Sequence, residues 1–211
     1  MTLTIPSPRR NRVDPWGTLV ATPERGSLMG NRGNLHDAEG VIVRDFRGDR
    51  WTICLLDFKN RHREIMQPGH YTELFFLDEA TALAAGHRPC AECQRDRYLL
   101  FRDLWAEAYA ADTPSAAEID RTLHAERWGD GQRLTYPMRG GDLPDGAMVI
   151  GPHDGSPYVR WQGRWFAWTF GGYLPGPDWG DDRVVYVLTP PSTVRVLAAG
   201  YPVGVHPSLA A

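Results

Sequence analysis

Two cysteines, Cys90 and Cys93, are separated by two residues in the stretch GHRPCAECQRDRY, residues 86–98. A C-x-x-C pair at the beginning of a helix places both sulfurs on one side of a tight turn, at about 2.3 Å from a shared zinc ion. The helix N-terminus also lowers the pKa of thiols there. A redox-active dithiol would need a preceding thioredoxin-like βαβ pattern, which we do not find. We therefore predict that Cys90 and Cys93 bind a metal ion, with zinc as the expected cofactor.

The sequence around the pair, LFFLDEATALAAGHRPCAECQRDRY at residues 74–98, resembles part of a known zinc domain. It is similar to the second half of the metal-binding N-terminal domain of the Ada methylation-response family. That family has a strand, a short helix with ALAAG, then F-R-P-C-x-x-C and a basic helical continuation. The resemblance extends over about residues 50–105 when the upstream strands are included, and it does not cover residues 111–211.

The resemblance implies a fold and a bound zinc ion, but not the repair chemistry of that family. Its members bind zinc through four cysteines, one of which accepts a methyl group from a DNA phosphotriester. The second pair matches Cys90 and Cys93, whereas the first pair would fall near Lys59 and Arg63, and neither is a cysteine. The resemblance therefore implies a zinc-binding, nucleic-acid-associated (DNA-binding) module that lacks the methyl-acceptor cysteine.

Tetrahedral zinc needs two more ligands, which the third cysteine and the histidines could supply. His62 lies close to one ligand position of the family pattern and is the first candidate. Cys54 lies in the strand-like run WTICLLDF; we favour a small buried side chain there but keep Cys54 in the candidate set. At the other histidines we favour a role other than metal binding: His36, His70 and His87. A metal-free structural or interaction protein is a further alternative.

A zinc-dependent hydrolase or nucleobase deaminase is the enzyme alternative. Residues 62–64 fit H-x-E and residues 89–93 fit P-C-x-x-C, as in the zinc deaminases. In this hypothesis His62 joins the pair in binding zinc, and Glu64 is the catalytic general acid and base for a zinc-bound water. The context disfavours it, because Pro68 would break the helix that H-x-E opens in that family. Whether the protein is an enzyme stays open.

Residues around the pair predict the elements that position it. We expect a short strand at residues 72–77, a helix capped by Asp78 and ended by Gly86, and a helix over residues 93–110. A second helix is expected within residues 113–128. Upstream, residues 40–46 and 50–58 are expected to pair as a hairpin.

The last third of the chain predicts short strands, a hairpin across residues 162–164 and a closing helix within residues 191–201. Its many aromatic side chains indicate a sheet core, or alternatively a surface for stacking on bases. We expect an α+β fold with an Ada-like metal-binding part at residues 1–130, made of a small antiparallel sheet with helices. A β-rich C-terminal part follows at residues 131–211, and the two could form one continuous domain.

Charge and hydropathy limit the expected partners. The chain of 211 residues has a net charge of −3, but residues 1–63 hold eleven Lys and Arg against seven Asp and Glu. A solvated basic arm with mixed charges on strand faces is the simpler interpretation, and a nucleic-acid partner that binds through this basic N-terminal third is the functional alternative. No apolar run approaches the roughly 18 residues of a membrane span, and the N-terminus lacks an apolar signal core. We expect a cytoplasmic protein with no membrane contact.

Overall fold

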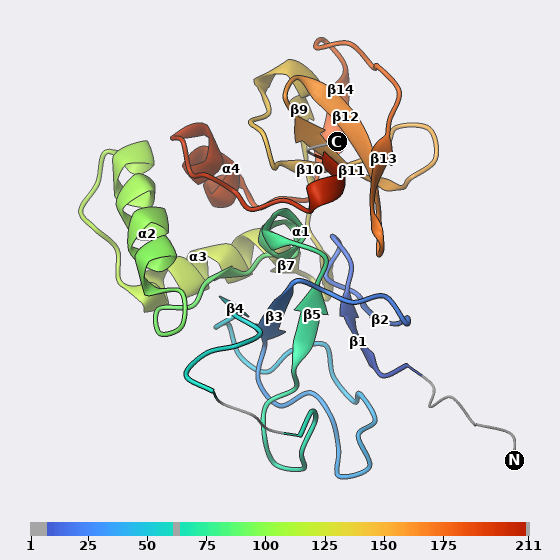
Figure 1. Ribbon diagram of the computed structural model, residues 1–211. Coiled ribbons are helices and arrows are strands. Elements are labelled where there is room, and N and C mark those ends of the chain that lie inside the picture. Colours follow the sequence, from blue (N-terminus) through green and yellow to red (C-terminus); the bar gives the residue numbers. More distant parts are fainter. Residues whose placement is uncertain (1–7, 61–63, 210–211) are drawn as a thin grey trace, which may run out of the picture.

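The computed structural model describes residues 8–60 and 64–209, and these form two six-stranded sheets with four α-helices (Figure 1). This confirms the expected α+β class. The first sheet has the order β2-β1-β5-β3-β4-β6 and the second has the order β13-β12-β11-β10-β14-β9. In Figure 1, helix α1 lies between the two sheets. Among the described helices, none combines the length and apolar character that crossing a membrane requires.

All strands of the first sheet come from the first 90 residues. Its strands are β1 (Arg10–Val13), β2 (Leu19–Ala21), β3 (Leu28–Asn31), β4 (Thr52–Cys54), β5 (Leu74–Phe76) and β6 (Arg88–Pro89). Two of its strand pairs, β1 with β5 and β4 with β6, are parallel. The expected antiparallel sheet is therefore a mixed sheet.

The predicted hairpin of residues 40–46 with residues 50–58 is wrong. Strand β4 pairs with β3 and β6, and the upstream segment contributes only an isolated bridge from Ile42 to His36. Val41 and Val43 are more than half exposed, at 57% and 52%. Ile42, between them, packs against the core, but the two exposed valines bury too little surface to hold this apolar run as a strand.

The helices agree closely with the sequence. Helix α1 (Glu79–Ala84) is capped by Asp78, whose Oδ1 accepts a hydrogen bond from the Thr81 N–H, and Gly86 follows it with φ of 86°. Helix α2 (Arg95–Tyr109) begins directly after the cysteine pair. Helix α3 (Ala116–Arg127) begins at a capping box formed by Ser115 and Glu118.

The second sheet contains the C-terminal strands, all antiparallel to their neighbours. They are β9 (Tyr136–Arg139), β10 (Met148–Ile150), β11 (Pro157–Trp161), β12 (Arg164–Thr169), β13 (Gly172–Pro175) and β14 (Val184–Val187). A short ribbon of β7 (Trp128–Gly129) and β8 (Gln132–Arg133) precedes them, and α4 (Pro191–Ala198) follows. The predicted turn is present, since Gln162 and Gly163 both have positive φ between β11 and β12.

One hydrophobic core joins the two parts of the chain. It includes Leu74 of the first sheet, Phe101 of α2 and Val187 of the second sheet. Trp165 and Trp168 of β12 are buried, at 3% and 8% exposure. The C-terminal aromatics thus contribute largely to packing between layers.

Two buried carboxylates at the beginning of α1 bind the C-terminal segment. Asp78 accepts hydrogen bonds from the Tyr173 hydroxyl and the His206 N–H, at 2.8 and 2.9 Å.

Glu79 accepts from the Tyr201 hydroxyl and the Gly204 N–H, both at 2.7 Å, and from the Arg97 guanidinium. These contacts hold the C-terminal segment and α2 against α1.

Glu79→Ala should reduce the free energy of unfolding by about 3 kcal/mol, because it leaves several buried donors without an acceptor. Urea denaturation followed by circular dichroism measures this loss. The matched control is Glu107→Ala on the exposed side of α2, which should change stability by less than about 0.5 kcal/mol. Equal effects of the two substitutions would contradict the anchoring role of Glu79.

Candidate metal centre

Three cysteines from two strands and a turn meet at one edge of the first sheet. Cys54 ends β4, and Cys90 directly follows β6. Parallel pairing of Ile53 with Pro89 brings the two together, and the Cys90 N–H donates to the Ile53 carbonyl at 2.9 Å. Cys93 lies in the turn before α2. All three sulfurs lie within 4.8 Å of one another, so the three cysteines could bind a metal ion.

Backbone N–H groups donate hydrogen bonds to two of these sulfurs, and a hydroxyl lies beside the third. The Glu92 N–H donates to Cys90 Sγ at 3.4 Å, and the Cys93 N–H is directed to the same sulfur. The Leu55 N–H donates to Cys93 Sγ. Thr52 Oγ1 lies 3.7 Å from Cys54 Sγ. Donors of this kind stabilise thiolates, which are the form of cysteine that binds metals.

The three thiols strongly influence one another's ionisation. Hydrogen bonds from Cys54 and Cys93 lower the pKa of Cys90 far below its ordinary value. The same hydrogen bond to Cys90, together with burial, raises the pKa of Cys54. A bound cation would favour the thiolate form of all three sulfurs.

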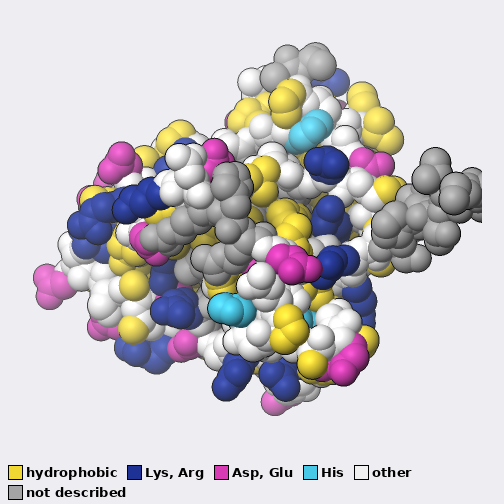
Figure 2. Space-filling view, turned by 60° about the horizontal axis from the view of Figure 1, so that its bottom comes forward, with side chains coloured by type: hydrophobic (Ala, Val, Ile, Leu, Met, Phe, Trp, Pro, Cys, Tyr) yellow, Lys and Arg dark blue, Asp and Glu magenta, His cyan; other side chains and the backbone are white. Residues whose placement is uncertain are grey.

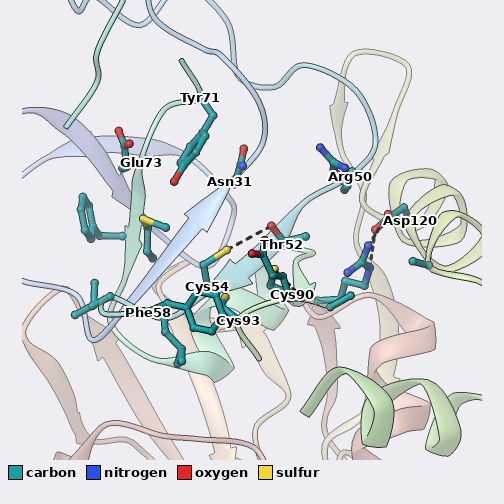
Figure 3. Close-up of a pocket in the computed structure, with 18 of the residues that line it drawn as sticks. Asn31, Arg50, Thr52, Cys54, Phe58, Tyr71, Glu73, Cys90, Cys93 and Asp120 are labelled. Carbon is teal, nitrogen blue, oxygen red and sulfur yellow. Dashed lines mark hydrogen bonds and ion pairs between the residues drawn. The ribbon is translucent and has the colours of Figure 1, made fainter. Parts of the chain in front are cut away.

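A cavity of about 770 Å³ opens beside the cysteines (Figure 3). One wall of the cavity is formed by side chains on one face of the first sheet. Met29 pairs with both Cys54 and Phe75 in the strand register, so these three side chains share that face. The opposite face of the same strands carries Ile53, Leu74 and Phe76, which are buried in the core. Further apolar side chains of the cavity come from the segments beside the sheet: Leu55, Leu56, Phe58 and Ile65.

A buried ion pair fixes the segment that leads to Cys90. The Arg88 guanidinium donates to both carboxylate oxygens of Asp120 on α3, at 2.8 and 2.7 Å. Both side chains are almost fully buried, at 3% and 6% exposure. Gln94 adds a second brace, because its side-chain amide donates to the Ile53 carbonyl and its N–H to the Cys90 carbonyl. The cysteines thus lie on a rigid frame of β4, β6 and two helices.

Of the residues that the sequence proposed for the site, Cys54 lies with the cysteine pair and Glu64 does not. Cys54, for which a small buried side chain was favoured, lies beside the predicted pair Cys90 and Cys93. His62 lies outside the described residues. Glu64 is exposed, is not helical and does not line the cavity.

The other histidines stay apart from the cysteines. Both ring nitrogens of His36 form hydrogen bonds: Nδ1 with the Thr72 hydroxyl at 2.6 Å, and Nε2 with the Gln67 carbonyl oxygen at 3.1 Å. His87 is fully buried, and its Nε2 accepts from Arg32. His70 is exposed. Among the described residues, no His, Asp or Glu has a ligand atom close enough to join the three sulfurs.

Several cavity residues were missed from the sequence: Asn31, Arg50, Tyr71, Glu73 and Asp120. They come from four separate segments that only the sheet and α3 bring together. One local signal was present for two of the cavity side chains. Glu73 and Phe75 alternate with the buried Leu74 and Phe76, and in a strand this alternation places Glu73 and Phe75 on the face opposite the core.

Comparison with known proteins supplies no function for the chain. No family model, no curated protein and no solved structure matches it. Functional inference therefore depends on the residues of the site themselves.

Asp120→Ala should destabilise the protein by about 3 kcal/mol, because Arg88 is left buried without its counter-charge. Thermal and urea unfolding measure the loss. The control is Asp103→Ala, which removes the partner of Arg102 in an exposed ion pair and should cost less than about 1 kcal/mol. A small effect of Asp120→Ala would mean that the buried pair does not fix the cysteine segment.

Proposed function

We propose that Cys54, Cys90 and Cys93 bind one Zn²⁺ ion and that the cavity gives a ligand access to its fourth coordination position. The observation that carries this proposal is the convergence of three sulfurs within 4.8 Å of one another, with N–H donors directed at two of them. Thiolate sulfur favours zinc over the harder cations magnesium and calcium.

The charge of such a site favours ligand binding over water activation. Three thiolates bound to Zn²⁺ give a net charge of −1, so less positive charge remains on the ion to polarise a bound water. The fourth position is then best suited to a neutral donor that enters from the cavity. Within the described part of the chain no further Cys, His, Asp or Glu joins the three sulfurs as a fourth ligand.

Association with nucleic acid is the biological role that we propose for this zinc module, without methyl-acceptor activity. Exposed arginines of the first 63 residues support it, among them Arg25, Arg44, Arg47 and Arg50. Figure 2 shows several Lys and Arg side chains on the face that carries the loops of the first sheet. The resemblance to the Ada metal-binding domain is the second support. A reducing, cytoplasmic compartment would keep the three cysteines available for metal.

Metal content is the direct test of the zinc centre. Wild-type protein purified without chelator should contain one zinc per chain by elemental mass spectrometry, and Cys54→Ser, Cys90→Ser and Cys93→Ser should each lose most of it. The matched control is Met29→Leu, which changes a neighbour of Cys54 on the sheet face and should keep the metal.

Two results would contradict the zinc centre. A metal-free wild-type protein would favour the structural or interaction role without metal. Zinc that persists in the Cys54→Ser variant would remove Cys54 from the ligand set. The same measurement on His62→Ala tests the sequence prediction for that residue.

Nucleic-acid association should show a steep dependence on salt. Fluorescence anisotropy with a labelled single-stranded oligonucleotide should give an affinity that falls with rising salt concentration, as counterions are released. The double variant Arg47→Ala/Arg50→Ala should bind more weakly and show a shallower slope. Glu107→Gln, far from these arginines in sequence and exposed, is the control. Equal binding by the arginine variant and wild type would contradict this surface as the contact.

A zinc-dependent hydrolase or nucleobase deaminase is the second candidate, and it is favoured by the set of three, rather than four, protein ligands among the described residues. Glu64 would then have to reach a zinc-bound water. Deaminase and nuclease assays on zinc-loaded protein decide the matter. Activity that is lost in Glu64→Gln with zinc retained would establish this alternative in place of a binding module.

A further inference from the structure

The register of the first sheet places a row of polar side chains beside the cysteine row. Asn31 pairs with Thr52, and continuing the β3–β5 register by one residue places Glu73 opposite Asn31. These side chains share the cavity face with the cysteines, and all three line the cavity. In Figure 3, Glu73, Tyr71 and Asn31 lie on one side of the cavity and the cysteines on the other. Because β3 separates β5 from β4, Glu73 lies roughly 10 Å from the strand of Cys54.

The carboxylate of Glu73 is held in place through one oxygen, while its other oxygen accepts no hydrogen bond. Its Oε2 accepts a hydrogen bond from the Met66 N–H at 2.7 Å, which holds the carboxylate in place. Its Oε1 is buried and has no hydrogen-bond partner in the described ranges, and the residue as a whole is 3% exposed. An unpartnered buried carboxylate oxygen is costly, and a ligand N–H group would relieve that cost.

Asn31 presents the complementary donor. Its Oδ1 accepts from the Gly33 N–H at 2.7 Å, which assigns the orientation of the amide. The Nδ2 group is therefore the end that remains for a ligand. Residues directly opposite on antiparallel strands have Cβ atoms about 5 Å apart, so the acceptor and the donor arise from neighbouring positions on the same face of the sheet. This arrangement suits a ligand edge with one donor next to one acceptor.

Aromatic side chains and the size of the cavity favour a flat ligand. Phe75 and Tyr71 line the cavity together with the polar row, and Phe58 lies on the side nearer the cysteines (Figure 3). Flat rings stack well on such side chains. The volume of about 770 Å³ can hold a ring with a sugar attached.

We propose that Glu73 and Asn31 bind the hydrogen-bonding edge of a nucleobase-like heteroaromatic ring inside this cavity. Glu73 Oε1 accepts from an N–H of the ring edge, and Asn31 Nδ2 donates to the adjacent ring nitrogen or carbonyl. The proposal goes beyond zinc binding, because the polar row does not include the metal ligands. It specifies which part of a nucleic acid, or of a free nucleoside, the cavity would take.

Nuclear magnetic resonance titration with cytidine and adenosine tests the proposal on the full-length protein. Both nucleosides should shift resonances of cavity residues in a saturable manner, whereas ribose and benzyl alcohol, which lack the edge, should not. Glu73→Gln keeps an oxygen for the Met66 N–H and places an amide N–H₂ at Oε1, while Asn31→Asp keeps an oxygen for the Gly33 N–H. Each substitution should weaken nucleoside binding about ten-fold or more. Glu107→Gln should not weaken it.

The outcomes separate this proposal from the zinc centre. Unchanged affinity in Glu73→Gln and Asn31→Asp, or equal binding of benzyl alcohol and nucleosides, would overturn it. So would the absence of saturable binding by either nucleoside. Zinc content measured on the same samples reports the metal centre alone: nucleoside binding by a protein without zinc would support this proposal and contradict the zinc centre. Folding of each variant is checked by circular dichroism, and Glu73→Asp, which keeps the charge but shortens its reach, is the second variant should Glu73→Gln not fold.

Discussion

Complete burial of α1 is the constraint on which the rest of the structure depends. Every residue of this short helix is buried, so the polar groups at both ends must find partners inside the protein. Asp78 and Glu79 bind the C-terminal segment at one end. At the other end Arg127 donates to the Gly86 carbonyl at 2.7 Å, and Arg133 donates to the Ala84 carbonyl. These partners come from α3, β8 and the C-terminus, so the helix holds both sheets together.

The helix end also determines where the cysteines lie. Gly86 turns the chain out of α1 with a positive φ, and β6 follows within two residues. A Cβ at this glycine would lie 2.4 Å from the Arg127 side chain, so the same position must also be small. Strand β6 then pairs beside β4 and places Cys90 next to Cys54. Burial and the neighbouring Arg32 and Arg133 lower the pKa of Arg127. This buried side chain is thus linked to the cysteine site through the short backbone segment that follows Gly86.

Local chemistry could be predicted from the sequence, and long-range pairing could not. Asp78, Gly86 and the turn at Gln162 follow from capping and turn preferences that act over a few residues. The C-x-x-C spacing identified Cys90 and Cys93 as a pair in the same way. Cys54 joins them through a parallel contact between segments about 36 residues apart, for which a two-residue strand gives no periodic signal. Glu73 and Asn31 come together only because β3 pairs with β5.

The position of the cysteines relative to the hydrophobic core determines how much a bound metal would add to folding stability. In small zinc domains the ion supplies much of the folding free energy, because little apolar surface can be buried. Here the core joins residues from Val13 to Tyr201 across both sheets, and the Arg88–Asp120 pair and Gln94 already fix the cysteine segment. The three cysteines are only partly buried and lie beside the cavity rather than within the core. A metal ion bound at this edge would therefore contribute less to folding than to what the cavity can bind.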